Sequence, residues 1–103
     1  MNTYTLVSTD TEYTLQIGQT IGSWCVGEDL LLLHGPFGAG KTVLTQGIAQ
    51  SFGILGPIRS PSFTLMSTYE ARLTLAHWDL FRLESIHEVW DLGILDQIDE
   101  KTV

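Results

Sequence analysis

The sequence predicts an α/β domain of three layers, in which a mixed, mainly parallel central sheet lies between helices. Two observations predict this fold. The apolar run at residues 30–33 consists of four leucines, as expected for a parallel strand that is buried on both faces. The glycine-rich stretch at residues 35–42 follows this run and opens a segment with helical periodicity at residues 43–52. Strand, glycine loop and helix in this order predict a βα unit at the centre of the fold.

Composition limits the class of protein. The chain has 103 residues, of which 44% are hydrophobic, so we expect residues 1–103 to form one domain. Its net charge of −7 argues against strong, charge-driven binding to nucleic acid. The single Cys25 excludes an intrachain disulfide, and no apolar run approaches the about 20 residues that span a bilayer. With no charged-then-apolar leader at the N-terminus, we expect a cytoplasmic protein that does not bind membranes.

Acidic residues are concentrated late in the chain. Residues 79–103 hold seven acids and two bases. Such a run is usually a solvated face, and the sharper interpretation is an acidic docking surface for a protein partner. Both interpretations stay open at this stage.

Two strands are predicted before the glycine loop. Residues 2–7 predict a short strand, since Tyr4 and Leu6 alternate with their neighbours in a β-prone run. Residues 30–34 predict the central strand, which the turn at residues 26–29 introduces.

A helix is predicted over about residues 10–25. Apolar residues recur there at spacings of four, four and three, which places them on one face. Gly18 and Gly22 lie in the same helix, where a glycine costs about 1 kcal/mol relative to alanine. They either allow another backbone to approach closely or weaken the helix, and both interpretations stay open. The apolar face consists of Tyr13, Ile17, Ile21 and Trp24, and the candidate N-caps are Ser8, Thr9 and Asp10.

The chain after the glycine loop alternates between helical and strand patterns. The helical pattern at residues 43–52 ends at Gly53, a plausible helix stop. Residues 53–61 contain two glycines and two prolines and predict a loop. Alternation at residues 63–69 and 73–78, with three residues between, predicts an antiparallel hairpin.

The last part of the chain predicts helical structure. Residues 85–92 predict a helix that ends at Gly93, and residues 94–98 predict one further helical turn. We find no internal repeat and no interdomain linker.

The glycine loop fits the pattern G-x-x-x-x-G-K-[ST] of phosphate-binding loops, so the predicted fold is P-loop NTPase-like. Glycines let the backbone curl until successive N–H groups point inward at phosphate oxygens, and the helix that follows adds its positive dipole. The Lys41 ammonium would bridge the β- and γ-phosphates, and the Thr42 hydroxyl would ligate Mg²⁺. A glycine-rich turn that merely caps a helix stays the simpler alternative. The N–H groups expected to hold the phosphates belong to Gly38, Ala39, Gly40 and Lys41.

Phosphoryl transfer also requires a carboxylate near the metal and a group that orients the attacking water or hydroxyl. Asp79 is the candidate carboxylate, because it follows the strand predicted at residues 73–78, where α/β folds place ligand groups. Thr64 or Ser62, just after the proline-containing loop, could reach the γ-phosphate. A local structural role stays open for each of these residues. No His, Cys or carboxylate spacing predicts zinc.

Four blocks of the sequence carry a resemblance to a known family. They are Thr14-Leu15 with Gly18, residues 31–42, Ser60-Pro61-Ser62-Phe63-Thr64-Leu65, and His77-Trp78-Asp79-Leu80-Phe81-Arg82-Leu83. In order and spacing over essentially all of the chain, they resemble the TsaE (YjeE) family of small bacterial P-loop ATPases. The glycine loop alone would be generic, whereas the last two blocks are much more specific.

The resemblance implies a Mg²⁺-dependent ATPase that works with the TsaB and TsaD proteins in making threonylcarbamoyladenosine at position 37 of tRNA. ATP hydrolysis would reset the TsaB–TsaD complex between cycles. By this resemblance Lys41, Thr64 and Asp79 are the expected catalytic residues, and Thr42 and Asp79 are the expected metal site. The expected ATP-binding residues are Thr11, which borders the adenine together with its neighbours at residues 9–11, and Gly38, Ala39, Gly40, Lys41, Thr42 and Val43.

The sequence departs from the family at one point. After the equivalent of residues 94–99, the family continues into a hydrophobic strand ending in Glu-Trp, whose Glu completes the Mg²⁺ site, whereas this sequence stops at Val103. We therefore expect a fold truncated at the C-terminus. The alternative to an ATPase is a nucleotide-dependent binding module with little or no hydrolysis. A small-molecule kinase would need a lid that carries arginines. The chain has only three arginines, which disfavours this class of enzyme.

Overall fold

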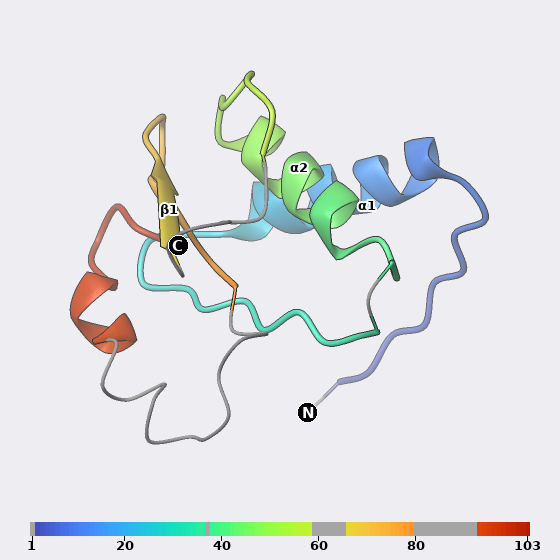
Figure 1. The fold of residues 1–103 in the computed structure, drawn as a ribbon, viewed down its shortest axis with the longest axis horizontal. Coiled ribbons are helices and arrows are strands. Elements are labelled where there is room, and N and C mark those ends of the chain that lie inside the picture. Colours follow the sequence, from blue (N-terminus) through green and yellow to red (C-terminus); the bar gives the residue numbers. More distant parts are fainter. Residues whose placement is uncertain (1, 37, 59–65, 80–92) are drawn as a thin grey trace.

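The structure is a computed structural model, which describes residues 2–36, 38–58, 66–79 and 93–103. These parts contain two α-helices, a two-stranded sheet and a short 3₁₀ helix, so the predicted α/β class is confirmed (Figure 1). In chain order the elements are α1 (Thr11–Trp24), α2 (Lys41–Ser51), β1 (Met66–Tyr69), β2 (Leu75–Trp78) and η1 (Ile94–Gln97).

Both predicted helices before the hairpin are confirmed, and short-range interactions set their ends. Asp10 caps α1 from an extended backbone conformation, and its Oδ1 accepts a 2.7 Å hydrogen bond from the backbone N–H of Tyr13. Gly40, with φ of 97°, precedes α2. Gly53, with φ of 94°, lies just beyond the other end of α2, as the helix stop predicted there requires.

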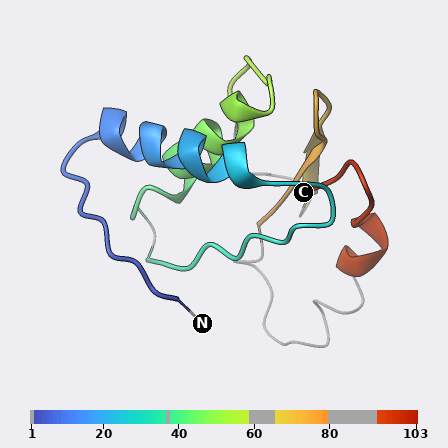
Figure 2. The same ribbon diagram turned by 180° about the vertical axis from the view of Figure 1, so that it is seen from behind.

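Glycines form the contact between α1 and α2. A Cβ on Gly18 would overlap the carbonyl oxygen of Leu44, and one on Gly47 would overlap the carbonyl oxygen of Leu15. The two helices therefore approach backbone to backbone, and they lie side by side in both views (Figures 1 and 2). This decides the open question about the glycines of α1: Gly18 is there for close approach. Gly22 has the same role, since its Cβ would overlap the side chain of Ser51.

The predicted apolar face of α1 is only partly correct. Ile21 packs against the core, but the Trp24 side chain is 74% exposed and Tyr13 is 38% exposed. The surface of α1 that touches α2 is centred on Gly18 and Gly22, so the large aromatic side chains lie at its margin and face solvent.

The core lies where α2, the segment after it and the hairpin meet. Arg72, in the hairpin turn, donates its backbone N–H to the Phe52 carbonyl at 3.1 Å and places its guanidinium 5.7 Å from the Phe52 ring centroid. Gln46 holds the segment after α2, because its side chain bonds the backbone of both Gly56 and Ile58. The buried residues of this core are Cys25, Ile48, Ala49, Phe52, Ile54, Ile58, Leu73 and Leu75.

The predicted hairpin is confirmed. β1 and β2 pair antiparallel in a register that places Met66 opposite Trp78 and Tyr69 opposite Leu75. β1 covers the whole described part of the strand predicted at residues 63–69, since residues 63–65 lie outside the described residues. β2 is two residues shorter than the strand predicted at residues 73–78. A parallel bridge joins Thr74 to Thr102, so the end of the chain runs alongside β2.

The mainly parallel central sheet is wrong for the described residues. Residues 2–7 form no strand there, and residues 30–34 form none either. The predicted central strand is not buried on both faces: Leu31 packs against the core, but Leu30 is 53% and Leu32 is 80% exposed. A strand exists only through ladder hydrogen bonds to its neighbours. Within the described part of the chain, residues 30–34 have no backbone hydrogen bond to another strand.

Two predictions concern the last part of the chain. The helical turn predicted at residues 94–98 is present as η1, and Gly93 precedes it with φ of 67°. The helix predicted at residues 85–92 lies outside the described residues. No helix among the described residues combines the length and apolarity needed to cross a membrane.

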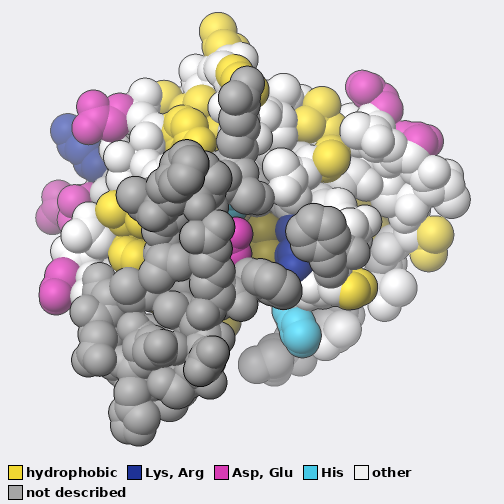
Figure 3. Space-filling model, viewed as in Figure 1, with side chains coloured by type: hydrophobic (Ala, Val, Ile, Leu, Met, Phe, Trp, Pro, Cys, Tyr) yellow, Lys and Arg dark blue, Asp and Glu magenta, His cyan; other side chains and the backbone are white. Residues whose placement is uncertain are grey.

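The surface carries few basic side chains. In the space-filling view of one face, Asp and Glu side chains lie mainly toward the margins, and Lys and Arg occupy little of the surface (Figure 3). Asp96, Asp99 and Glu100 are all exposed, which fits either interpretation of the acidic C-terminal stretch.

Burial changes the pKa of one titratable side chain in the hairpin, that of His77 on β2. It is half-buried, and its Nδ1 atom has no hydrogen-bond partner in the described part of the structure. Desolvation lowers the pKa of His77 below its ordinary value of 6.5, and the Asp79 carboxylate partly opposes this shift.

The first prediction tests the glycine contact. We expect Gly18→Ala to lower the free energy of unfolding by about 1–2 kcal/mol, because overpacking costs up to about 3 kcal/mol and the better helix propensity of alanine returns about 1 kcal/mol. Gly56→Ala is the matched control, since a Cβ there meets nothing within 4 Å. Urea unfolding of both variants measures the difference, and equal losses would contradict the close approach.

The second prediction concerns pH. Unfolded His77 takes up its proton near 6.5, whereas folded His77 takes it up only at lower pH, so the unfolded state binds more protons between the two values. The free energy of unfolding therefore carries no penalty from His77 above this pH window, and it falls as pH falls through the window. We expect His77→Gln to flatten this fall in unfolding experiments in metal-free buffer. An unaltered pH dependence in His77→Gln would refute the assignment.

Candidate functional site

Left-handed glycines shape the loop before α2. Gly38 has φ of 82° and Gly40 has φ of 97°, values that side chains with a Cβ rarely adopt. Space is not the constraint at Gly38, because a Cβ there would meet nothing within 4 Å. Between the two glycines, the backbone N–H of Ala39 donates to the Pro36 carbonyl at 3.1 Å and closes a turn.

The first turn of α2 presents backbone donors. The first hydrogen bond at this end runs from the N–H of Leu44 to the carbonyl of Gly40 at 3.0 Å. The N–H groups of Lys41, Thr42 and Val43 come before that bond and have no partner inside the helix. Since Gly40 offers no side-chain cap, these donors and the helix dipole make this end suited to an anion.

Lys41 and Thr42 differ in how their side chains are used. The Nζ atom of Lys41 donates a 2.6 Å hydrogen bond to the carbonyl of Gly35 and so spans the base of the loop. Thr42 is exposed, and its hydroxyl has no hydrogen-bond partner among the residues that the structure describes. The Lys41 ammonium can therefore reach an anion on the loop only by giving up the Gly35 carbonyl.

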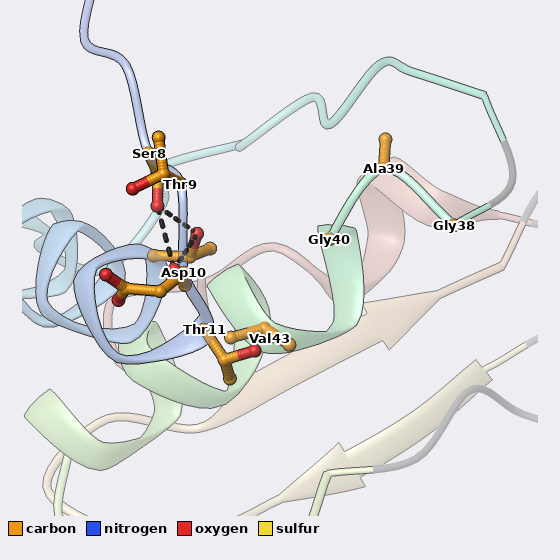
Figure 4. A pocket seen from close by; sticks show the side chains of 9 residues that line it. Ser8, Thr9, Asp10, Thr11, Gly38, Ala39, Gly40 and Val43 are labelled. Atoms are coloured by element: carbon orange, nitrogen blue, oxygen red, sulfur yellow. Dashed lines mark hydrogen bonds between the residues drawn. The ribbon is translucent and has the colours of Figure 1, made fainter.

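A cavity of about 250 Å³ lies beside this loop (Figure 4). One wall comes from the segment that enters α1 and from the first turn of α1, and the other comes from the glycine loop and the first turn of α2. The packing of α1 on α2 thus brings together two parts of the chain that are distant in sequence. The lining residues are Ser8, Thr9, Asp10, Thr11, Thr14, Gly38, Ala39, Gly40 and Val43.

Hydrogen bonds fix the wall next to α1. The hydroxyls of Ser8 and Thr14 are 2.7 Å apart, and the Ser8 hydroxyl also donates to the carbonyl of Asp10 at 2.9 Å (Figure 4). The Asp10 carboxylate caps α1 by accepting a hydrogen bond from the backbone N–H of Tyr13. This wall is therefore polar and held in place before any ligand arrives.

The structure groups some of the predicted site residues and not others. Thr11, Gly38, Ala39, Gly40 and Val43 line one cavity, and Lys41 and Thr42 follow directly on α2. Asp79 follows β2 and is half-buried, but it does not line this cavity. Thr64 and Ser62 lie outside the described residues. The described residues contain no group of three or more His, Cys, Asp or Glu that could hold a metal ion.

Sequence reasoning did not place Ser8 and Thr14 on the cavity. Ser8 is only a candidate helix cap in the sequence, whereas Asp10 falls within residues 9–11, which the resemblance places beside the adenine. Their position beside the loop depends on the α1–α2 contact, which no local pattern encodes. The cluster of hydroxyl and carboxylate side chains just before α1 was the available signal.

Taken together, the geometry is suited to an elongated ligand with an anionic end. The N–H groups at the start of α2 and the Lys41 ammonium can hold negative oxygens, and the adjoining cavity can hold a polar remainder. In a chain with a net charge of −7, these donors make a local positive site.

Comparisons with known proteins agree with the predicted family. The family model described as "Threonylcarbamoyl adenosine biosynthesis protein TsaE" matches residues 8–103. A protein of Nostoc named tRNA threonylcarbamoyladenosine biosynthesis protein TsaE is 46% identical over 82% of this chain and 52% of its own length. The protein of the same name from Treponema pallidum is 38% identical over 84% of this chain and 64% of its own length.

A solved structure shows a similar fold. The crystal structure of Bacillus subtilis YdiB superposes with a TM-score of 0.63 and 28% sequence identity, covering 89% of this chain and 67% of that one. The chain spans about half to two thirds of the length of these relatives. Because the family model matches nearly the whole chain and several relatives exceed 30% identity, the chain belongs to the TsaE family.

Proposed function

We propose that this chain acts as a Mg²⁺-dependent ATPase in tRNA threonylcarbamoyladenosine biosynthesis, on a complex of TsaB and TsaD. The observation that carries the proposal is the junction of the glycine loop and α2. Left-handed Gly38 and Gly40 lead into a helix whose first N–H groups have no partner inside the helix, next to a cavity of about 250 Å³.

Each part of this junction has a role in binding ATP. The N–H groups at the start of α2 hold phosphate oxygens, and Lys41 exchanges its bond to Gly35 for the β- and γ-phosphates. The cavity beside the loop takes the nucleoside, with Thr11 and Val43 on opposite walls. When the ammonium moves from a neutral carbonyl to a triphosphate, it exchanges a contact with one charged partner for a contact in which both partners are charged.

The residues present fit Mg²⁺ in donor type. Thr42 offers an exposed hydroxyl on the first turn of α2, and Asp79 offers a carboxylate after β2. Oxygen donors of this kind suit Mg²⁺, which neutralises developing charge on the phosphates when it is bound. Asp10, although it lines the cavity, is not a metal ligand in this scheme, since its carboxylate caps α1.

The proposed partners are proteins rather than tRNA itself. A net charge of −7 and few basic side chains disfavour contact with a phosphate backbone. The exposed acidic residues Asp96, Asp99 and Glu100 offer a surface for a protein with a basic patch. The relatives named for threonylcarbamoyladenosine biosynthesis support the pathway.

A second candidate is a nucleotide-dependent binding module with little hydrolysis. It is favoured by the distribution of carboxylates, because among the described residues Asp10 lies at the cavity but is occupied as a cap, and Asp79 does not line the cavity. In this case ATP would organise the loop and its surroundings for docking without turnover.

The third prediction tests ATP binding. We expect Lys41→Ala to weaken ATP binding by about 10- to 100-fold, since hydrogen bonds to charged groups contribute about 1.5–3 kcal/mol. Lys101→Ala, which removes an exposed ammonium of the same type, should bind ATP with unchanged affinity. Titration calorimetry with ATP and Mg²⁺ measures both variants. Unchanged affinity in Lys41→Ala would refute the phosphate cradle.

The fourth prediction separates the two functions. We expect slow ATP hydrolysis by the chain alone, a clear increase when TsaB and TsaD are added, and no increase with Lys41→Ala. Phosphate release measured with and without the two proteins provides the test. Measurable ATP binding without any stimulated hydrolysis would exclude the ATPase and favour the binding module.

A further inference from the structure

Thr14, in the first turn of α1, contacts both walls of the cavity through the two branches of its side chain. Its hydroxyl oxygen lies 2.7 Å from the Ser8 hydroxyl and 3.2 Å from the Asp10 carbonyl, in its own wall. Its methyl carbon Cγ2 lies 3.9 Å from the position that a Cβ on Gly40 would occupy, in the opposite wall (Figure 4). One side chain therefore meets both the entrance of α1 and the glycine loop.

The hydroxyl branch belongs to a closed cluster of three oxygens. The Ser8 hydroxyl also lies 2.9 Å from the Asp10 carbonyl, so two hydroxyl protons serve three short contacts. Either Ser8 donates to Asp10 and Thr14 donates to Ser8, or Thr14 donates to Asp10 and Ser8 donates to Thr14. Both arrangements hold the Thr14 hydroxyl at the same place.

The segment that enters α1 has few other anchors. In the part of the chain that the structure describes, residues 2–9 make no backbone–backbone hydrogen bond. Ser8 is exposed, and its side chain bonds there only to the Asp10 carbonyl and the Thr14 hydroxyl. Since Asp10 is only two residues away along the chain, Thr14 is the partner that ties Ser8 to the body of α1.

The same hydroxyl decides where the methyl group points. In a helix the Thr side chain favours two values of χ1, and a hydroxyl bond to the carbonyl three or four residues earlier selects one of them. Asp10 is the fourth residue before Thr14, and its carbonyl is within reach of the hydroxyl. Because both branches leave one Cβ, fixing the hydroxyl also fixes the methyl group beside Gly40.

Gly40 is the residue where the loop enters α2. Its φ of 97° is rarely adopted by residues with a Cβ, so the loop has no side chain of its own at this point. Beyond its chain neighbours and its own helix, the Thr14 methyl is the one atom of the described residues within 4 Å of the empty Cβ position. A group that α1 supplies therefore separates the two walls here.

We propose that Thr14 is a positioning residue of the cavity, which holds the entrance of α1 at a fixed distance from the glycine loop. The inference rests on the proposed function, in which the loop binds phosphates and the cavity takes the nucleoside. ATP spans both parts, so its affinity depends on how they are placed relative to each other. A ligand made of phosphates alone occupies only the loop and the start of α2, and its affinity does not depend on Thr14.

The fifth prediction compares ATP with inorganic tripolyphosphate, each with Mg²⁺, in titration calorimetry on the full chain. Thr14→Val keeps the shape of the side chain and loses the hydroxyl, whereas Thr14→Ser keeps the hydroxyl and loses the methyl group. We expect each variant to weaken ATP binding by about 3- to 10-fold and to leave the affinity for tripolyphosphate unchanged.

Thr20 on α1 provides the matched control. Its hydroxyl donates to the Gln16 carbonyl four residues earlier, as the Thr14 hydroxyl can to Asp10, but Thr20 does not line the cavity. Thr20→Val and Thr20→Ser should therefore bind both ligands as the unaltered chain does. A loss of folded protein lowers the binding of both ligands alike, so retained affinity for tripolyphosphate shows that a variant is folded.

The outcomes separate this inference from the proposed function. Equal losses for the two ligands, unchanged ATP affinity in either Thr14 variant, or the same loss in the Thr20 variants would overturn the positioning role alone. An unaltered chain that binds tripolyphosphate but not ATP would overturn the proposed function and this inference with it.

Discussion

The backbone-to-backbone contact of α1 and α2 is the constraint on which the candidate site depends. Gly18 and Gly47 let the two helices approach until a Cβ on either one would overlap a carbonyl of the other helix. That separation places the entrance of α1 against the loop before α2. Ser8 and Thr11 therefore lie opposite Gly38 and Gly40 across one open cavity, and a wider helix pair would separate its two walls.

The features that could be predicted from the sequence are those that depend on interactions between residues close together in the chain. The Asp10 cap, the left-handed Gly40 and the stop at Gly53 depend on a few adjacent residues, so both helices were predicted with nearly correct ends. The loop was predictable for the same reason. The lining by Ser8 was not, because it requires the approach of two helices that a periodic pattern does not orient.

The incorrect predictions concern the sheet and have a common cause. Leu30 and Leu32 have the composition of a buried strand, but burial and ladder bonds come from neighbours rather than from the segment itself. Trp24 was misplaced in a similar way, since its spacing fits an apolar face that the glycine contact turns outward. Patterns of hydrophobicity thus indicate which segments can be buried, and tertiary partners decide which ones are.

One segment, residues 30–34, leads from the side of β2 into the candidate site. Leu30 lines a slot beside β2, and residues 30–34 lead directly into Gly35, whose carbonyl accepts a 2.6 Å hydrogen bond from the Lys41 ammonium. The loop is anchored at its far end by α2, whereas at its near end the described residues provide no ladder bonds. The approach to Gly35 is therefore the less restrained side of the loop. Its conformational freedom is part of what the loop must lose when Lys41 leaves Gly35 for an anion.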